Sequence, residues 1–293
     1  MKQKKLLAAA VVLFVLMVLN YYQTAADLLI SEEDSYLFGA YFLNRYLFGT
    51  LYRNIFFSQL ILKSLPIFAF NFLFATELYQ EFCIGGVYYF VRRKNRWNWY
   101  LRCCLKLGLY ALLFTIVYIV LPLLLFCATH NPGSLAILLQ QCFPSTLCLA
   151  LYLFASTFVI NLLSIKLGSS YGCYMVIAAT VLFATAYYFT ALYLDTTYGG
   201  YSAYDAYTYT LSGVTFALYY LNPFVQLGIP WHAISPDNAR FKEIILLQAG
   251  TITNLPTWTY SICFLFLLAV VACAVGWLFI RKQDISLVDK EMS

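Results

Sequence analysis

The amino-acid sequence predicts an all-α, multi-pass membrane protein with six transmembrane helices in a single domain, residues 1–293. Hydrophobic residues make up 62% of the chain and charged residues 11%. Soluble domains have about 45–50% hydrophobic residues and about 25% charged residues. Several separate apolar runs reach 20 or more residues, the length that a helix needs to cross the hydrocarbon core. The solvent of this chain is therefore expected to be the lipid bilayer of the cell (cytoplasmic) membrane.

The apolar runs place the six spans at residues 6–26, 55–76, 103–127, 135–165, 172–194 and 258–280. Pro66 predicts a kink in the second span, because proline removes a backbone donor. Lys63 in the same span either faces a polar cavity or extends its ammonium group to the interface. Short turns are predicted at 129–133 and at 168–170.

Two segments are predicted on the outer side. Residues 27–54 are acidic and rich in aromatic side chains, which favours an outer loop with a helix lying along the interface. The alternative is that these residues lengthen the second helix. Residues 195–256 are rich in tyrosine and contain two apolar patches, 211–221 and 244–247, too short to span. We expect re-entrant or interfacial helices there, packed as a compact cap.

The charge distribution orients this topology. With both termini in the cytoplasm, 13 of the 18 Lys and Arg residues lie inside, together with 5 of the 13 acidic residues. Cationic loops are retained on the cytoplasmic side of a membrane. The sequence therefore predicts cytoplasmic N- and C-termini and an outer 195–256 segment.

The sequence lacks the motifs that are typical of several other protein classes. The cations lie in short loops, so no nucleic-acid partner is expected. Neither histidine, His130 or His232, belongs to a metal-binding or catalytic motif, and the nine cysteines form no CxxC pair. No phosphate-binding GxxxxGK[ST] loop occurs. The chain is thus predicted to be no enzyme, with no metal or cofactor of its own.

The stretch 77–106 holds six of the Lys and Arg residues between two spans. Glu77 and Glu81 are one helical turn apart and share a face; their nearest candidate partners are Arg92, Arg93 and Arg96. We expect Trp97, Trp99 and Tyr100 to anchor at the inner interface. Four amides could line a pathway, although packing between helices is the commoner role: Asn71, Gln140, Gln141 and Asn161.

The order of these features resembles the permease subunits of ATP-binding-cassette exporters of the type-2 permease family. The similarity covers residues 60–278 and is clearest around the second and third spans. The matching features are Glu77 and Glu81, Gly85-Gly86, the apolar run 87–91, Arg92-Arg93, the cluster 94–96, Arg102 with Lys106, the 154–177 turn region, and Leu221-Asn222-Pro223. Gly-Gly replaces the more usual Ser-Gly or Asn-Gly, and the Tyr-rich segment has no counterpart.

The resemblance implies two permease subunits, identical or different, above two cytosolic ATPase subunits that bind ATP and Mg²⁺. A short cytoplasmic coupling helix between the second and third spans would contact the ATPase. The residues implied at this contact are Glu77, Glu81, Gly85, Gly86, Arg92, Arg93, Lys94 and Arg96. The chain would then move a substrate, by export, with the substrate itself left open.

Two other readings remain open. The first is a non-transporting sensor or assembly protein that binds a ligand or protein through its Tyr-rich outer segment. The second is an intramembrane enzyme, which would need a catalytic cluster assembled from distant spans.

Overall fold

The computed structural model describes residues 2–28, 39, 42–43, 46–47, 57–82, 96–131, 133–198, 208–210, 212–227, 251–253 and 256–282. This part of the chain is almost entirely helical. Its helices are α1 (Lys2–Leu28), α3 (Phe57–Phe74), α4 (Glu77–Gln80), α6 (Arg96–Thr129), α7 (Leu135–Leu167), α8 (Ser169–Tyr198), α9 (Gly213–Leu221), the 3-10 helix η2 (Val225–Leu227) and α11 (Trp258–Lys282).

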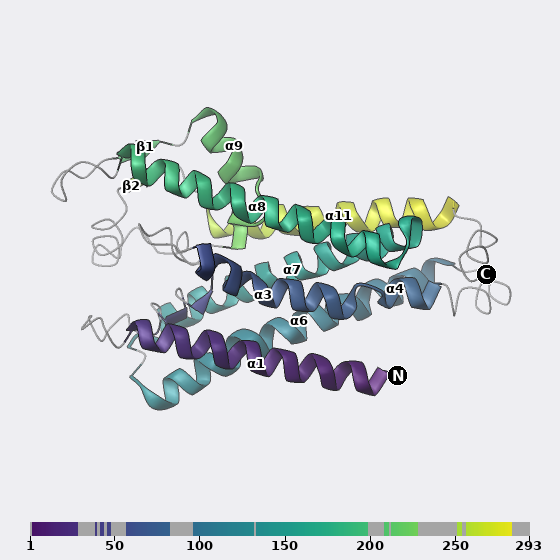
Figure 1. Ribbon diagram of the computed structural model, residues 1–293, viewed down its shortest axis with the longest axis horizontal. Helices are drawn as coiled ribbons and strands as arrows, with labels where there is room; N and C mark the ends of the chain where they lie inside the picture. Colours follow the sequence, from purple (N-terminus) through teal and green to yellow (C-terminus); the bar gives the residue numbers. More distant parts are fainter. Residues whose placement is uncertain are drawn as a thin grey trace.

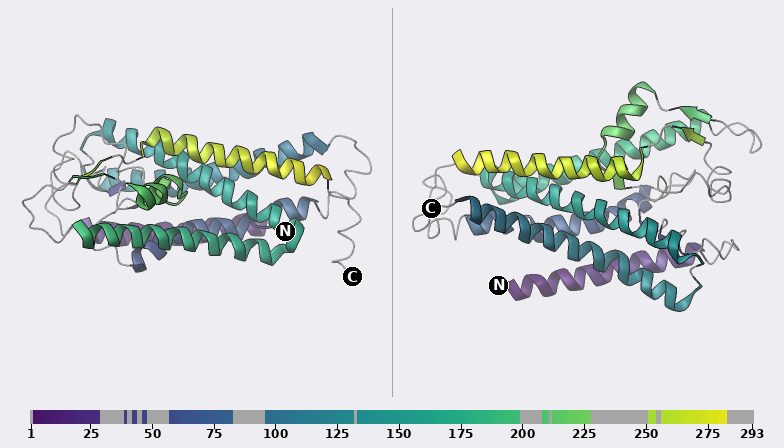
Figure 2. Two further views of the ribbon diagram at one scale, coloured as in Figure 1. Left: turned by 90° about the horizontal axis from the view of Figure 1, so that it is seen from above. Right: turned by 180° about the vertical axis from the view of Figure 1, so that it is seen from behind.

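The long helices lie side by side along one axis (Figure 1). The start of α1, the helix α4 and the last turns of α11 lie at one end of the bundle, on the right of Figure 1; we call this the α4 end. The helix α9 and two short strands lie at the other, the α9 end, and Figure 2 shows the same grouping from two further sides. The segments predicted to be cytoplasmic and those predicted to be outer thus lie at opposite ends.

Helix α7 is the centre of the bundle, in contact with α3, α4, α6, α8 and α11. Small and polar side chains on α7 make this possible, since helices in lipid associate through close packing and interhelical hydrogen bonds. A close approach occurs at Gly172 of α8, where an added Cβ would lie 2.7 Å from Ile160 O and Ser164 N of α7. Of the turn predicted at 168–170, only Gly168 lies between the helices, with a φ of 97° that suits glycine, and Ser169 already begins α8.

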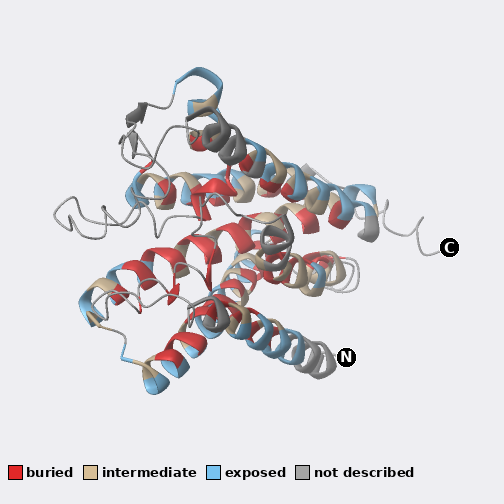
Figure 3. Cartoon of the chain, turned by 60° about the vertical axis from the view of Figure 1, so that its left-hand side comes forward, coloured by how far each residue is buried: buried red, intermediate tan, exposed pale blue. Residues whose placement is uncertain are grey.

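The outer faces of the helices are apolar, while polar side chains are buried between them. Leu105 of α6 and Leu267 of α11 are 72% and 61% exposed, whereas Asn71 and Asn161 are fully buried. Figure 3 shows buried faces turned toward the bundle interior and exposed faces turned outward. Among the described residues, three helices are long and apolar enough to cross a membrane: α6, α7 and α11. Shorter apolar stretches lie at Ala10–Thr24 and Tyr171–Tyr187.

Several helix boundaries differ from the predicted spans; α1 and α8, for example, begin at Lys2 and Ser169, before the expected residues 6 and 172. Helix α6 begins at Arg96, earlier than the expected residue 103, because its first turns continue the helix beyond the apolar run. The second predicted span corresponds to α3, which ends at Phe74, and a turn at Ala75 and Thr76 separates it from α4. Pro66 lies inside α3, as expected.

The described side chains of residues 39–47 are buried inside the bundle and do not lie along a membrane surface, where the sequence predicted them. Phe42, Leu43, Tyr46 and Leu47 are all buried, at most 4% exposed. The Phe42 ring stacks on Phe126 of α6 at 4.2 Å between centroids. Aromatic content alone predicted a membrane-surface position, but burial between α1 and α6 removes more apolar surface from water.

Hydrogen bonds fix this segment between the two helices. Asn20 Nδ2 of α1 donates to Tyr46 O and to Tyr118 Oη of α6, both at 2.8 Å. Tyr46 Oη in turn donates to Tyr118 O at 2.9 Å. Most of residues 27–54 lie outside the described part of the chain.

At the α9 end, a short helical segment is held against α8 and α11. The predicted helix at 211–221 is confirmed as α9, and the patch 244–247 lies outside the described residues. Asn222 Nδ2 donates to Phe183 O of α8 at 2.9 Å, and Ser261 Oγ of α11 donates to Gln226 Oε1. The strands β1 (Thr208–Thr210) and β2 (Thr251–Thr253), which pair in parallel, were not predicted.

Candidate functional site

The candidate site is the α4 end, where three of the predicted coupling residues are described. Glu77 begins α4, Glu81 directly follows it, and Arg96 begins α6. The other predicted residues lie outside the described part of the chain; these are Gly85, Gly86, Arg92, Arg93 and Lys94. The geometry of the site is therefore built on Glu77, Glu81 and the helices around them.

The turn between α3 and α4 is anchored by a side chain from the central helix. Thr76 occupies the N-cap position of α4, but its side chain makes no capping hydrogen bond. Asn161 of α7 supplies the missing partners, since its Oδ1 accepts from Leu78 N at 2.8 Å and its Nδ2 donates to Phe74 O at 2.9 Å. The same Nδ2 donates to Thr157 O at 2.8 Å.

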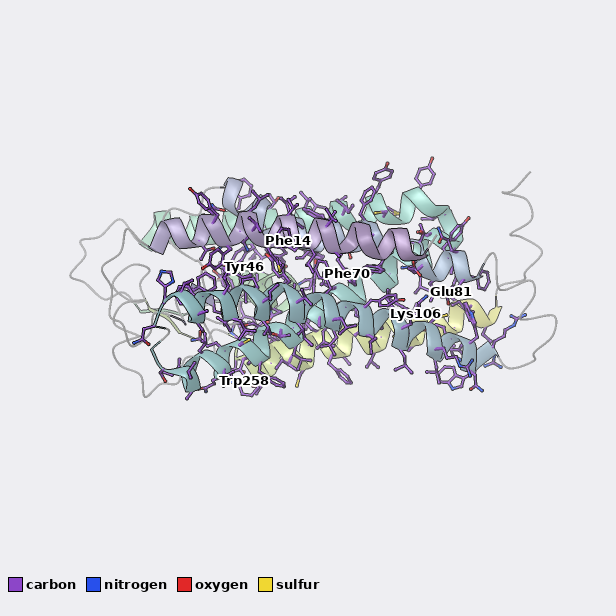
Figure 4. The ribbon with its side chains drawn as sticks, turned by 90° about the horizontal axis from the view of Figure 1, so that it is seen from below. Phe14, Tyr46, Phe70, Glu81, Lys106 and Trp258 are labelled. Atoms are coloured by element: carbon purple, nitrogen blue, oxygen red, sulfur yellow. The ribbon has the colours of Figure 1, made fainter. Side chains whose placement is uncertain are left out.

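Both glutamates meet a lysine of α6. Lys106 Nζ lies 3.2 Å from Glu77 Oε2 and also donates to Glu81 Oε1. Cys103, one turn before the lysine, donates from its Sγ to Glu81 Oε2 at 3.1 Å. Lys106 Nζ also lies 5.6 Å from the centre of the Tyr110 ring, within the range of a cation–π contact. Figure 4 shows Glu81 and Lys106 facing each other at this end of the bundle.

These contacts add a partner that the sequence does not single out. Lys106 forms ion pairs with both glutamates, while two of their expected partners, Arg92 and Arg93, lie outside the described residues. The sequence pattern assigns Lys106 only to the basic start of the third predicted span. Lys106 lies across one loop from the two glutamates, at a similar depth, which makes it a candidate partner. The choice among the nearby cations, however, depends on how the helices pack.

The ion pairs of this cluster orient α4 more than they stabilise the protein. The side chains of Lys106, Glu77 and Glu81 are 29%, 19% and 31% exposed. Ion pairs with this much access to water contribute roughly 0–1 kcal/mol each. Two carboxylates share one ammonium group, which ties both ends of α4 to the same point on α6.

A buried apolar cluster lies beside the ion pairs. Leu78 and Phe82 pack with residues of α6, α7 and α11; these are Trp99, Tyr100, Cys103, Leu107, Phe158 and Ile280. Trp99 and Tyr100 are buried, so their predicted role as interface anchors is wrong, whereas Trp97 is 43% exposed. Residues 77–82 are therefore attached to α6 and α7 through polar side chains, and they share a buried apolar cluster with α6, α7 and α11.

The remaining sequence candidates are the four amides predicted inside the spans. Asn71 Oδ1 accepts from Ser156 Oγ at 2.9 Å and from Thr157 Oγ1 at 2.7 Å. Gln140 is exposed and Gln141 is buried. Within the described ranges, no group of three or more His, Cys, Asp or Glu side chains is placed to hold a metal ion.

Comparisons of this chain with protein-family models, curated proteins and solved structures gave no match.

Proposed function

We propose that this chain is the membrane-spanning permease subunit of an ATP-binding-cassette exporter and works with a separate cytosolic ATPase. The observation that carries the proposal is the attachment of α4 to three other elements of the bundle. Through Lys106 it is tied to α6, through Asn161 to α7, and through Leu78 and Phe82 to a buried cluster that includes α11. A displacement at the residues that follow Glu81 would be passed to several long helices at once.

The proposal also includes how the chain crosses the membrane. Six helices would cross the cytoplasmic membrane, with both termini and the 77–106 stretch in the cytosol and the α9 end outside. This is supported by the separation of these segments to opposite ends of the bundle (Figure 1) and by the apolar outer faces of α6 and α11. A second permease subunit, identical or different, would complete the pathway.

The proposal is tested by reversing two cations of the 77–106 stretch. The double variant Arg92→Glu/Arg93→Glu should insert normally, because exposed ion pairs contribute only about 0–1 kcal/mol to stability. Like charges brought together at an interface cost several kcal/mol, so the variant should lose the ATPase on purification and lose transport. Insertion is checked by labelling Asn95→Cys and Asp205→Cys with an impermeant reagent, in a protein whose native cysteines are replaced.

The matched control is Arg281→Glu/Lys282→Glu, which reverses two cations at the end of α11 and weakens the cytoplasmic positive charge equally. It should retain the partner and transport. A correctly inserted Arg92→Glu/Arg93→Glu variant that still binds the ATPase and still transports would show that these cations only orient the chain.

A further inference from the structure

At the junction of α3 and α4, one backbone hydrogen bond of the helical pattern is missing, and a side chain bonds to both of its groups instead. In an α-helix the N–H of each residue bonds to the carbonyl four residues earlier, so Leu78 N would donate to Phe74 O. Instead, Leu78 N donates to Asn161 Oδ1 and Phe74 O accepts from Asn161 Nδ2. The amide of Asn161 therefore sits between the donor and the acceptor of one helical hydrogen bond.

The ladder continues directly after this insertion. Gln80 N donates to Thr76 O at 2.8 Å, and Glu81 N is directed at the carbonyls of Glu77 and Leu78. Insertion of a side chain into the ladder is one of the known causes of a sharp helix bend. The turn at Ala75 and Thr76 thus has a specific cause on the neighbouring helix.

Two hydrogen-bonding arrangements would satisfy the backbone groups at this junction. Asn161 is fully buried and Leu78 is 3% exposed, so the Leu78 N–H needs a partner within the protein. The part-buried Phe74 carbonyl also has a partner here, Asn161 Nδ2. The two backbone groups can be paired through Asn161, as they are here, or directly with each other in a continuous helix. A change between the two would move Glu77 and Glu81 relative to Lys106.

We propose that Asn161 is the positioning residue of the α3–α4 hinge: its inserted amide holds α4 at the angle that brings Glu77 and Glu81 to Lys106. The use of this hinge in coupling rests on the function proposed above. The hinge itself does not, because every group that forms it belongs to this chain.

The test uses the contact between Cys103 Sγ and Glu81 Oε2, 3.1 Å apart. In a Glu81→Cys protein that retains Cys103 and no other native cysteine, the new sulfur replaces Cγ of Glu81 and lies two bonds short of the carboxylate oxygen. A short bifunctional methanethiosulfonate reagent, which bridges this gap, should therefore join the two thiols rapidly through two disulfides. The rate is followed by mass spectrometry of the disulfide-linked tryptic peptides, on protein that is monodisperse by gel filtration. No ATPase is needed, so failure of this test and failure of the proposed function are distinguishable.

Two variants of similar side-chain volume separate hydrogen bonding from packing. Asn161→Leu removes both inserted hydrogen bonds and should slow cross-linking about tenfold, as expected for the loss of two neutral hydrogen bonds. Asn161→Gln keeps an amide and should stay closer to the unaltered rate. Asn71→Leu removes a buried amide from the same α3–α7 interface without touching the ladder, and should leave the rate unchanged.

An unchanged rate in Asn161→Leu, or equal slowing in the Leu and Gln variants, would overturn the proposal. If Asn161→Leu is not recovered folded, solid-state NMR of the unaltered chain replaces it, with the Leu78 amide nitrogen and the Asn161 side-chain carbonyl carbon labelled. A close contact between these two nuclei supports the inserted amide, and its absence contradicts it.

Discussion

At the scale of single residues, the α4 end depends on two side chains far from Glu77 in the sequence. Lys106 and Asn161 come from α6 and α7, and each contacts groups on α4 or at its start. Glu77 and Glu81 could be singled out from their helical spacing, but their partners could not. The choice among several nearby cations, and the contact with a buried amide, depend on how the helices pack.

Replacing Lys106 should reveal its role in orienting α4. Lys106→Met leaves two partly buried carboxylates without their ammonium group and should destabilise the protein by about 1 kcal/mol, whereas Lys106→Arg should restore much of the loss. The measurement is thermal unfolding in mild detergent. Lys166→Met, at the exposed end of α7, is the matched control; an equal loss of stability in both methionine variants would contradict a specific ion-pair role for Lys106.

At the scale of elements, the apolar runs predicted the long helices well because a hydrophobic stretch of bilayer length has few alternatives to a helix. The structure departs from prediction where a segment's position depends on tertiary contacts. Tyr46 and Phe42 are buried through contacts with α1 and α6. The break after Phe74 depends on Asn161, and the pairing of β1 with β2 joins segments about forty residues apart.

The packing of α7 against α8 depends on the missing side chain at Gly172. Gly172→Ala would bring a Cβ to 2.7 Å from two backbone atoms of α7, and overpacking of this kind costs typically about 1–3 kcal/mol. We expect this loss in unfolding experiments in detergent. The control is Gly108→Ala of α6, where the Cβ would meet only the Phe154 ring at 3.7 Å. Similar unfolding of the two variants would contradict the close α7–α8 contact.

At the scale of the whole molecule, the bundle has one end built from α4, the start of α6 and the end of α11, and another built around α9 (Figures 1 and 2). The sequence predicted this division from charge, because cations gather in the loops of one side. The sequence did not predict a substrate. Polar residues inside the bundle do not indicate one either, because side chains such as Asn71 and Gln226 bond to neighbouring helices.

The central claim is that a cytosolic ATPase binds at the α4 end. The most direct measurement is purification of the unaltered full-length chain from its native membrane in gentle detergent, with brief chemical cross-linking, followed by mass spectrometry. We expect a protein containing a GxxxxGK[ST] phosphate-binding loop to co-purify in a stoichiometric amount and to be cross-linked within residues 77–106. Recovery of the folded chain without any such protein, or cross-links to an ATPase only at the α9 end, would contradict the account.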